Sequence, residues 1–238
     1  TGNMAGEIGR HVGLESLLKL AGYIHDCGKA DRNFQTYICG QTKQKVNHSS
    51  AGGRILKEFI QSDQVLTNLQ NSKVKFQYFE ELFTYILLAH HGLYDMVNYG
   101  GMEHNTYRRL RYDEAVDYHY IEDVVPFIQK INRELQEQGE KTIVTLIEEA
   151  YQEFELIYFK LVQLSKKNTD MEKRKEEKEY YVSCLTRLCL SILKEADIYD
   201  SANAFHNPKQ RIWKENERRK HWVDAWGRIE AMYQRYEG

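Results

Sequence analysis

The 238-residue chain contains only two prolines, Pro126 and Pro208. Proline is the residue that most strongly breaks helix interiors, so its scarcity permits long helices. Strand signals are also lacking, because sustained apolar–polar alternation is nearly absent and no Asn-Gly or Asp-Gly pair marks a hairpin. Helical periodicity covers most of the chain, and we predict an all-α protein.

Long apolar runs are missing as well, since none approaches the roughly 20 residues that a membrane-spanning helix needs. We therefore expect no membrane association. The four cysteines have no C-x-x-C spacing, which argues against a zinc finger and favours reduced, mostly buried thiols in a cytoplasmic protein. A formal net charge of −2 excludes a uniformly basic nucleic-acid-binding surface but leaves room for local basic strips.

The chain shows no internal repeat and no flexible linker, so we expect one domain over residues 1–238. In this domain, residues 206–238 would form a C-terminal helix. The other helices are expected at 4–12, 14–26, 48–62, 76–91, 113–138 (bent near Pro126), 141–166 and 174–200. We expect a loop over 31–46, Asn47 as the N-cap of a helix opened by His48, and a close helix contact at the small residues 51–53.

Histidines and carboxylates recur at the ends of the predicted helices. His25-Asp26 ends an apolar helix, His48 opens another, the pair His90-His91 ends a third, and Asp197 lies near the end of a fourth. Taken in order, these residues form a ligand inventory for two divalent metals and predict a metal-dependent phosphodiesterase. Two alternatives remain open: one histidine of the His90-His91 pair is structural, or Asp200 takes the place of Asp197.

The adjacent residues His25 and Asp26 point about 100° apart on a helix, so they cannot chelate as a pair four residues apart would. An imidazole can instead bind one metal at about 2 Å, while the carboxylate distributes its two oxygens over two metals. Such a bridge holds metals roughly 3.5–4 Å apart, the separation used in phosphoryl chemistry. Lys29, one turn beyond Asp26, could place its ammonium near a phosphate oxygen.

These motifs resemble those of a known family. The stretch 20–30, with its sequence LAGYIHDCGKA, is followed by Phe34-Gln35-x-Tyr37, and NHSSAG, AHHGL and ADxxDS follow at 47–52, 89–93 and 196–201. Over roughly residues 1–205 the chain is similar to the HD-superfamily nuclease of type I CRISPR systems. That nuclease is fused to, or works beside, a superfamily 2 helicase, and its fold is a helical domain with a metal site in the helix core.

The resemblance implies a role for each motif. His25, Asp26 and Asp197 would hold one metal, and Asp26, His48, His90 and His91 the other. The expected activity is endo- or exonucleolytic cleavage of single-stranded DNA in antiviral defence, with Lys29 helping to neutralise the phosphate. The partners would be the helicase and the surveillance complex guided by CRISPR RNA. His-rich ligation favours manganese, nickel, cobalt or iron, with magnesium also possible.

The family has a further metal-binding histidine in the first helix, which we expect to lie before Thr1. His11 is the only histidine upstream of the His-Asp pair. On one continuous helix it would lie about 21 Å from His25, and only a break at Gly13 could bring it back.

The segment after the His pair mixes cations and aromatic rings, namely Tyr107, Arg108, Arg109 and Arg111. Such a mixture suits a single strand, whose phosphates meet arginine and whose bases stack on rings, although an ordinary charged turn has the same composition. Trp213, Trp222 and Trp226 form either a packing stripe or a docking face for the helicase.

Two other functions share these ligands. An HD-type phosphohydrolase acting on nucleotides or cyclic dinucleotides would need a closed, base-recognising pocket instead of an open groove. A non-catalytic HD module that only tethers a partner would be expected to have lost ligands.

Overall fold

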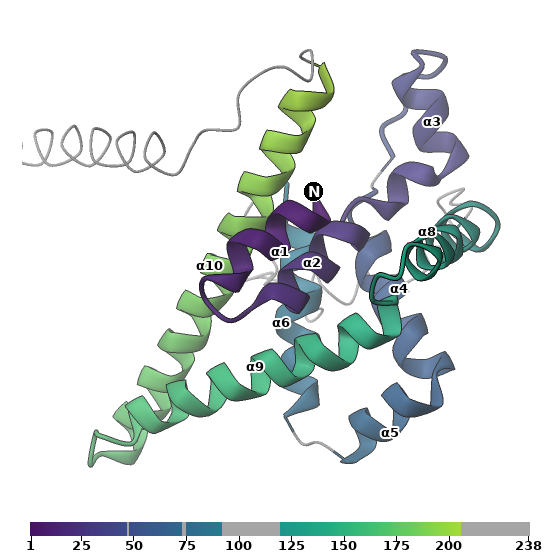
Figure 1. Cartoon of the computed structure of the whole chain (residues 1–238). Coiled ribbons are helices and arrows are strands. Elements are labelled where there is room, and N and C mark those ends of the chain that lie inside the picture. The colour runs from purple at the N-terminus through teal and green to yellow at the C-terminus, as the bar shows by residue number, and fades with distance from the viewer. Residues whose placement is uncertain (47, 73–74, 92–119, 206–238) are drawn as a thin grey trace, which may run out of the picture. The chain divides into compact units, whose positions relative to one another are not determined.

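The computed structural model describes residues 1–46, 48–72, 75–91 and 120–205. Within these ranges every regular element is a helix and no strand occurs, which confirms the all-α prediction (Figure 1). The chain divides into two compact units, Thr1–Tyr199 and Asp200–Gly238, and the description below concerns the first. The predicted C-terminal helix over 206–238 lies outside the described residues, and the single domain over 1–238 stays a prediction.

The described helices follow one another in chain order. They are α1 (Gly2–Arg10), α2 (Glu15–Ile24), the 3-10 turn η1 (Cys27–Ala30), α3 (Arg32–Ile38), α4 (Ala51–Ser62), α5 (Gln64–Ser72), α6 (Phe76–Ala89), the π-helical turn η2 (Tyr120–Val124), α8 (Val125–Glu137), α9 (Ile143–Ser165) and α10 (Met171–Phe205). Pro126 lies in the first turn of α8, where its missing N–H breaks no intrahelical bond.

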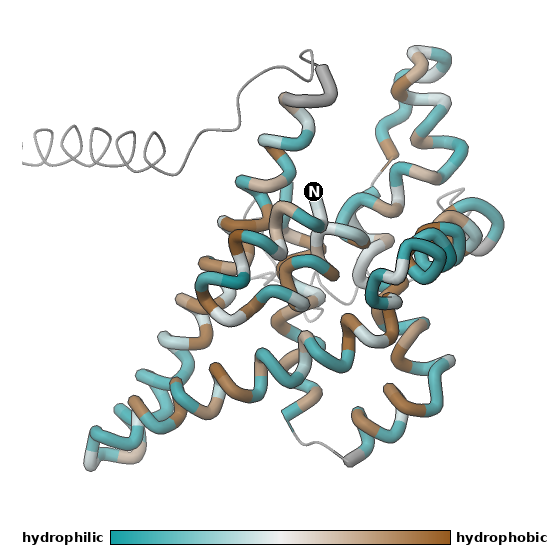
Figure 2. Tube along the Cα trace, in the orientation of Figure 1, coloured by the Kyte–Doolittle hydropathy of each residue, from teal (hydrophilic) through white to brown (hydrophobic). Residues whose placement is uncertain are grey.

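Helix α2 is the centre of the core. It packs against α1 and α9, and Figure 1 shows α1 and α2 side by side with α9 running obliquely below them. Leu17, Leu18 and Ile24 of α2 are buried, as are the rings of Phe79 on α6 and Phe154 on α9. Hydrophobic and hydrophilic positions alternate in short runs along α9 and α10, as amphipathic helices at the edge of a core require (Figure 2).

The start of α2 is capped by side chains from a distant part of the chain. Its own N-cap residue, Leu14, makes no side-chain cap. Glu153 of α9 accepts hydrogen bonds from the backbone N–H groups of Ser16 and Leu17, each 2.9 Å long, and Glu149 accepts one from the Ser16 hydroxyl at 2.6 Å. Carboxylates at a helix N-terminus accept hydrogen bonds from the unpaired N–H groups of the first turn and interact favourably with the positive end of the helix dipole. These contacts therefore fix the position of α2 against α9.

The chain does reverse at Gly13, but this break does not bring His11 toward His25. Gly2 packs against Tyr23, whereas Gly9 packs against Leu14, so α1 and α2 are antiparallel. His11, at the end of α1, therefore lies at the opposite end of the helix pair from His25.

Two local predictions were wrong, and one helix was not anticipated. Residues 32–38 form helix α3 within the expected loop, because the side chain of Asp31 caps it by accepting from the N–H groups of Asn33 and Phe34. Helix α5 was not anticipated; Asp63 starts it by accepting from the N–H groups of Val65 and Leu66. His48 does not open a helix, since α4 begins three residues later at Ala51, and Asn47 lies outside the described residues.

All four cysteines are free thiols, as predicted, but only Cys27 and Cys189 are buried, whereas Cys39 and Cys184 are exposed. Burial raises the pKa of the Cys189 thiol to about 12. Among the described helices, none is long and apolar enough to cross a membrane.

Candidate metal centre

The predicted histidines lie at helix ends that converge on Asp26. Helix α2 ends at Ile24, so His25 is its C-cap and Asp26 begins the tighter turn η1. This change of geometry allows two adjacent residues to approach, and His25 Nε2 lies 3.3 Å from Asp26 Oδ2. In the same way His90 is the C-cap of α6, with His91 directly after it.

His48 reaches the cluster from the loop before α4, and glycine makes its approach possible. A Cβ atom on Gly28 would lie 2.1 Å from the His48 carbonyl oxygen, so only glycine fits there without a backbone shift. A Cβ on Gly52 would lie 2.7 Å from the carbonyl oxygen of Ile24. This contact confirms the predicted close approach at residues 51–53, which holds the start of α4 against the end of α2.

The two carboxylate oxygens of Asp26 face two different groups of side chains. Oδ1 lies 3.4 Å from His48 Nε2, 3.3 Å from His90 Nε2 and 3.9 Å from His91 Nε2. Oδ2 faces His25, whose Nε2 is also 3.3 Å from Asp197 Oδ1. Two candidate metal groups result, Asp26 with His48, His90 and His91, and Asp26 with His25 and Asp197. In each, all the ligand atoms lie within 4.8 Å of one another.

Backbone contacts set the tautomers of two of these histidines. His25 Nδ1 lies 3.1 Å from the Gly22 carbonyl oxygen, and His90 Nδ1 lies 2.6 Å from that of Leu87. Because a carbonyl only accepts, each Nδ1 carries the hydrogen, and each Nε2 directs its lone pair toward the cluster when the ring is neutral.

Several polar atoms of the cluster converge on one another, and within the described part of the chain two of them are buried without a hydrogen-bond partner. Among the described residues, Asp26 Oδ1 and His90 Nε2 are buried and have no hydrogen-bond partner. His48 Nε2 and His91 Nε2 lie 2.6 Å apart. A buried polar atom without a partner is costly, and a divalent cation is the group that would satisfy convergent lone pairs.

The spacing also suits a metal. Ligand atoms about 2.1 Å from a tetrahedral ion lie roughly 3.4 Å from one another. The distances of 3.3–3.4 Å that join Asp26 to His25, His48 and His90 match this value. The residues therefore suit both transition-metal ions and magnesium, because one group offers three imidazoles and the other offers two carboxylates.

The electrostatics of the cluster are dominated by imidazole–carboxylate contacts. Burial lowers the pKa of His25, but Asp197 and Asp26 outweigh it and raise that pKa to about 9. Burial favours the neutral form of Asp26, yet the imidazoles of His25, His48 and His90 hold its pKa far below the ordinary value. Burial, together with His90 and His48, lowers the pKa of His91 to about 4, which keeps this ring neutral and able to bind a metal.

Lys29 lies on the rim of the cluster. Its ammonium contacts Asp26 Oδ2, the oxygen that also faces His25. The side chain remains partly exposed, and Gln35 of α3 donates a 2.6 Å hydrogen bond to the Lys29 carbonyl oxygen.

Other predicted site residues are not placed by the structure. Tyr107, Arg108, Arg109 and Arg111 lie outside the described residues. Of the two competing carboxylates, Asp197 contacts His25, and Asp200 belongs to the second compact unit.

Sequence reasoning missed one contact beside the cluster. The ring of Phe34 packs on the ring of His48, with centroids 4.6 Å apart. Phe34 belongs to a motif that the sequence does contain, but only the fold shows which histidine it touches.

Comparison with known proteins identifies a family to which the chain is similar. A family model described as "Cas3, HD domain" matches residues 4–165, more than half of the chain. The match includes every candidate ligand except Asp197, which the fold brings to His25 from α10. Searches of curated proteins and of solved structures found no match.

Proposed function

The chain belongs to the Cas3 HD-domain family of CRISPR-associated, metal-dependent nucleases, and on that premise we propose that it cleaves single-stranded DNA with two divalent metal ions. Family membership also implies association with a helicase and with the CRISPR system. More specifically, we propose that it works beside a superfamily 2 helicase and is recruited by the RNA-guided surveillance complex of a type I system.

One observation carries the two-metal proposal: the two oxygens of Asp26 face two separate ligand groups. A carboxylate placed in this way can bridge two cations. His25 and Asp197 would complete one site, and His48, His90 and His91 the other. When bound, the metals would activate water as a nucleophile and offset charge on the phosphate.

The protein's own groups have distinct tasks in this proposal. The hydrogen bonds from His25 to Gly22 and from His90 to Leu87 orient both rings before any metal arrives. Lys29, at the exposed rim, would bind a phosphate oxygen as a point charge. Tyr107, Arg108, Arg109 and Arg111 would hold the flanking strand. The three-imidazole site favours manganese, nickel, cobalt or iron over magnesium.

The proposal is tested with circular single-stranded DNA. Chelator-treated protein should leave the circle intact, and adding manganese, nickel or cobalt should linearise it, whereas Asp26→Ala should cut under neither condition. Cleavage by Asp26→Ala at the wild-type rate would refute the two-metal mechanism. A circle is used because only an endonucleolytic cut opens it, and a linear strand of the same sequence then reports exonuclease activity.

A second candidate, hydrolysis of nucleotides or cyclic dinucleotides, shares the candidate ligands. The same assay separates the two functions, because a small-molecule phosphohydrolase would release phosphate or mononucleotides from such substrates and leave the circle uncut.

A further inference from the structure

We propose that Phe34 is a positioning residue that sets the orientation of the His48 imidazole toward its metal. The inference rests on the proposed metal site and extends it to a residue outside the ligand set. The two rings meet edge to face, with centroids 4.6 Å apart and planes inclined by 61°. This is a favourable aromatic geometry, and Phe34 is 8% exposed.

His48 needs such a support more than its neighbours do. His25 and His90 cap helices, and each is oriented by a hydrogen bond from Nδ1 to a carbonyl three residues earlier. His48 lies in the loop before α4, and its ring nitrogen Nε2 contacts only other candidate ligands among the contacts described above, namely Asp26 Oδ1 at 3.4 Å and His91 Nε2 at 2.6 Å. Before any metal binds these ligands, the ring is also positioned by the close approach of the His48 backbone to Gly28 and by the edge-to-face contact with Phe34.

Phe34 is itself restrained by the contacts of helix α3. Asp31, fully buried, caps α3 by accepting from the N–H groups of Asn33 and Phe34. Arg32 binds both carboxylate oxygens of Asp123 at 2.7 and 2.8 Å, which ties α3 to η2.

Next to Phe34, Gln35 donates a hydrogen bond to the Lys29 carbonyl oxygen. Helix α3 therefore links the turn that carries Asp26 to the loop that carries His48. A side chain on this link can set the distance and angle between two ligands, because its own freedom is small.

The first test measures metal affinity with Phe34→Leu, which keeps an apolar side chain but removes the ring. Titration of chelator-treated protein with nickel should show binding at the His48 group weakened about 10–100-fold, the usual cost of losing a group that orients a ligand. Phe34→Tyr keeps the ring and should bind within about threefold of the wild type. Unchanged nickel affinity in Phe34→Leu would overturn the proposal.

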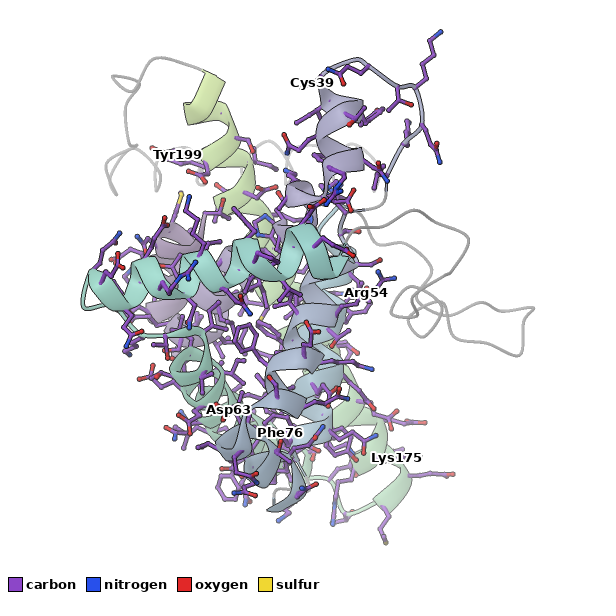
Figure 3. The ribbon with its side chains drawn as sticks, turned by 90° about the vertical axis from the view of Figure 1, so that its right-hand side faces the viewer. Cys39, Arg54, Asp63, Phe76, Lys175 and Tyr199 are labelled. Atoms are coloured by element: carbon purple, nitrogen blue, oxygen red, sulfur yellow. The ribbon has the colours of Figure 1, made fainter. Side chains whose placement is uncertain are left out.

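A matched control separates positioning from general loosening of the fold. Phe76 is a fully buried ring at the start of α6, which Figure 3 places far from Cys39 and Tyr199. Phe76→Leu should lower the unfolding temperature at least as much as Phe34→Leu, yet leave nickel affinity intact. An equal loss of affinity in both variants would overturn the proposal.

A second readout does not depend on metal. In nitrogen-15 spectra of the metal-free protein, Phe34→Leu should move or broaden the ring signals of His48, while those of His25 and His90 stay in place. Unmoved His48 signals would overturn positioning. If the wild type binds no metal but Phe34→Leu still shifts only the His48 signals, the two-metal function is refuted and the positioning of His48 by Phe34 stands.

Discussion

Replacing Asp26 by asparagine should reduce the protein from two bound metals to one. The amide keeps the shape of the carboxylate, but only its oxygen can ligate, so one of the two groups loses its Asp26 ligand. The group with His48, His90 and His91 would still offer three imidazoles, whereas His25 and Asp197 would be left as two ligands. We expect the second group to lose its metal.

The magnitude follows from the lost charge. A unit charge about 2.1 Å from a monovalent cation contributes about 2 kcal/mol even at the dielectric constant of water, or about 30-fold in affinity. A divalent ion doubles this energy, and the partly buried site lies at a lower effective dielectric constant, so 30-fold is a lower bound for the retained metal.

The assay is metal content after equilibrium dialysis, together with calorimetric titration. Asp63→Asn is the matched control, because it makes the same chemical change at the N-cap of α5, where asparagine caps as well as aspartate. Two tightly bound equivalents in Asp26→Asn would refute the bridging role of this carboxylate.

Four further outcomes are expected. Glu153→Gln removes one of two charged acceptors at the start of α2, and it should lower the free energy of unfolding by about 1 kcal/mol, or roughly 2–4 °C in a thermal melt. Gly28→Ala forces its Cβ against the His48 carbonyl, and calorimetry should show weaker metal binding. Lys29→Ala should slow steady-state DNA cleavage by roughly 10²-fold while dialysis shows both metals retained. In chelator-treated protein, His25 has a folded pKa of about 9 against an ordinary 6.5, so its contribution to stability should be complete below pH 6.5 and disappear as the pH rises through 9.

The first two of these predictions have a control variant, and the last two have an outcome that would contradict them. Glu148→Gln makes the same change on the same helix and should leave the melting temperature in place. Gly40→Ala meets no atom within 4 Å and, although its positive φ makes it costly, should not alter metal affinity. Normal turnover in Lys29→Ala would remove Lys29 from the chemistry. A pH-stability curve unchanged in His25→Gln would show that this ring does not supply the predicted pH dependence.

The fold class and the candidate ligands could be predicted from the sequence because both depend on local chemistry. Two prolines in 238 residues and helical periodicity indicate helices, and the structure confirms them. Imidazole and carboxylate are common metal ligands, and their order at predicted helix ends, together with the family resemblance, named the candidates before any helix was placed: His25, Asp26, His48, His90, His91 and Asp197. Helix ends were less predictable: α3 and α5 depend on caps by Asp31 and Asp63, whose strength depends on the conformation of a few bonds.

Only the tertiary structure decided how these residues meet. Sequence alone left Asp197 and Asp200 as competitors, and packing of α10 against the core brings Asp197 to His25. The cap on α2 comes from Glu153, 137 residues from Ser16, and no local pattern encodes a contact across that separation. The edge-to-face contact of Phe34 with His48 likewise depends on the tertiary fold. Residue chemistry determines what can bind a metal, whereas the directions of lone pairs and the distances between them depend on packing.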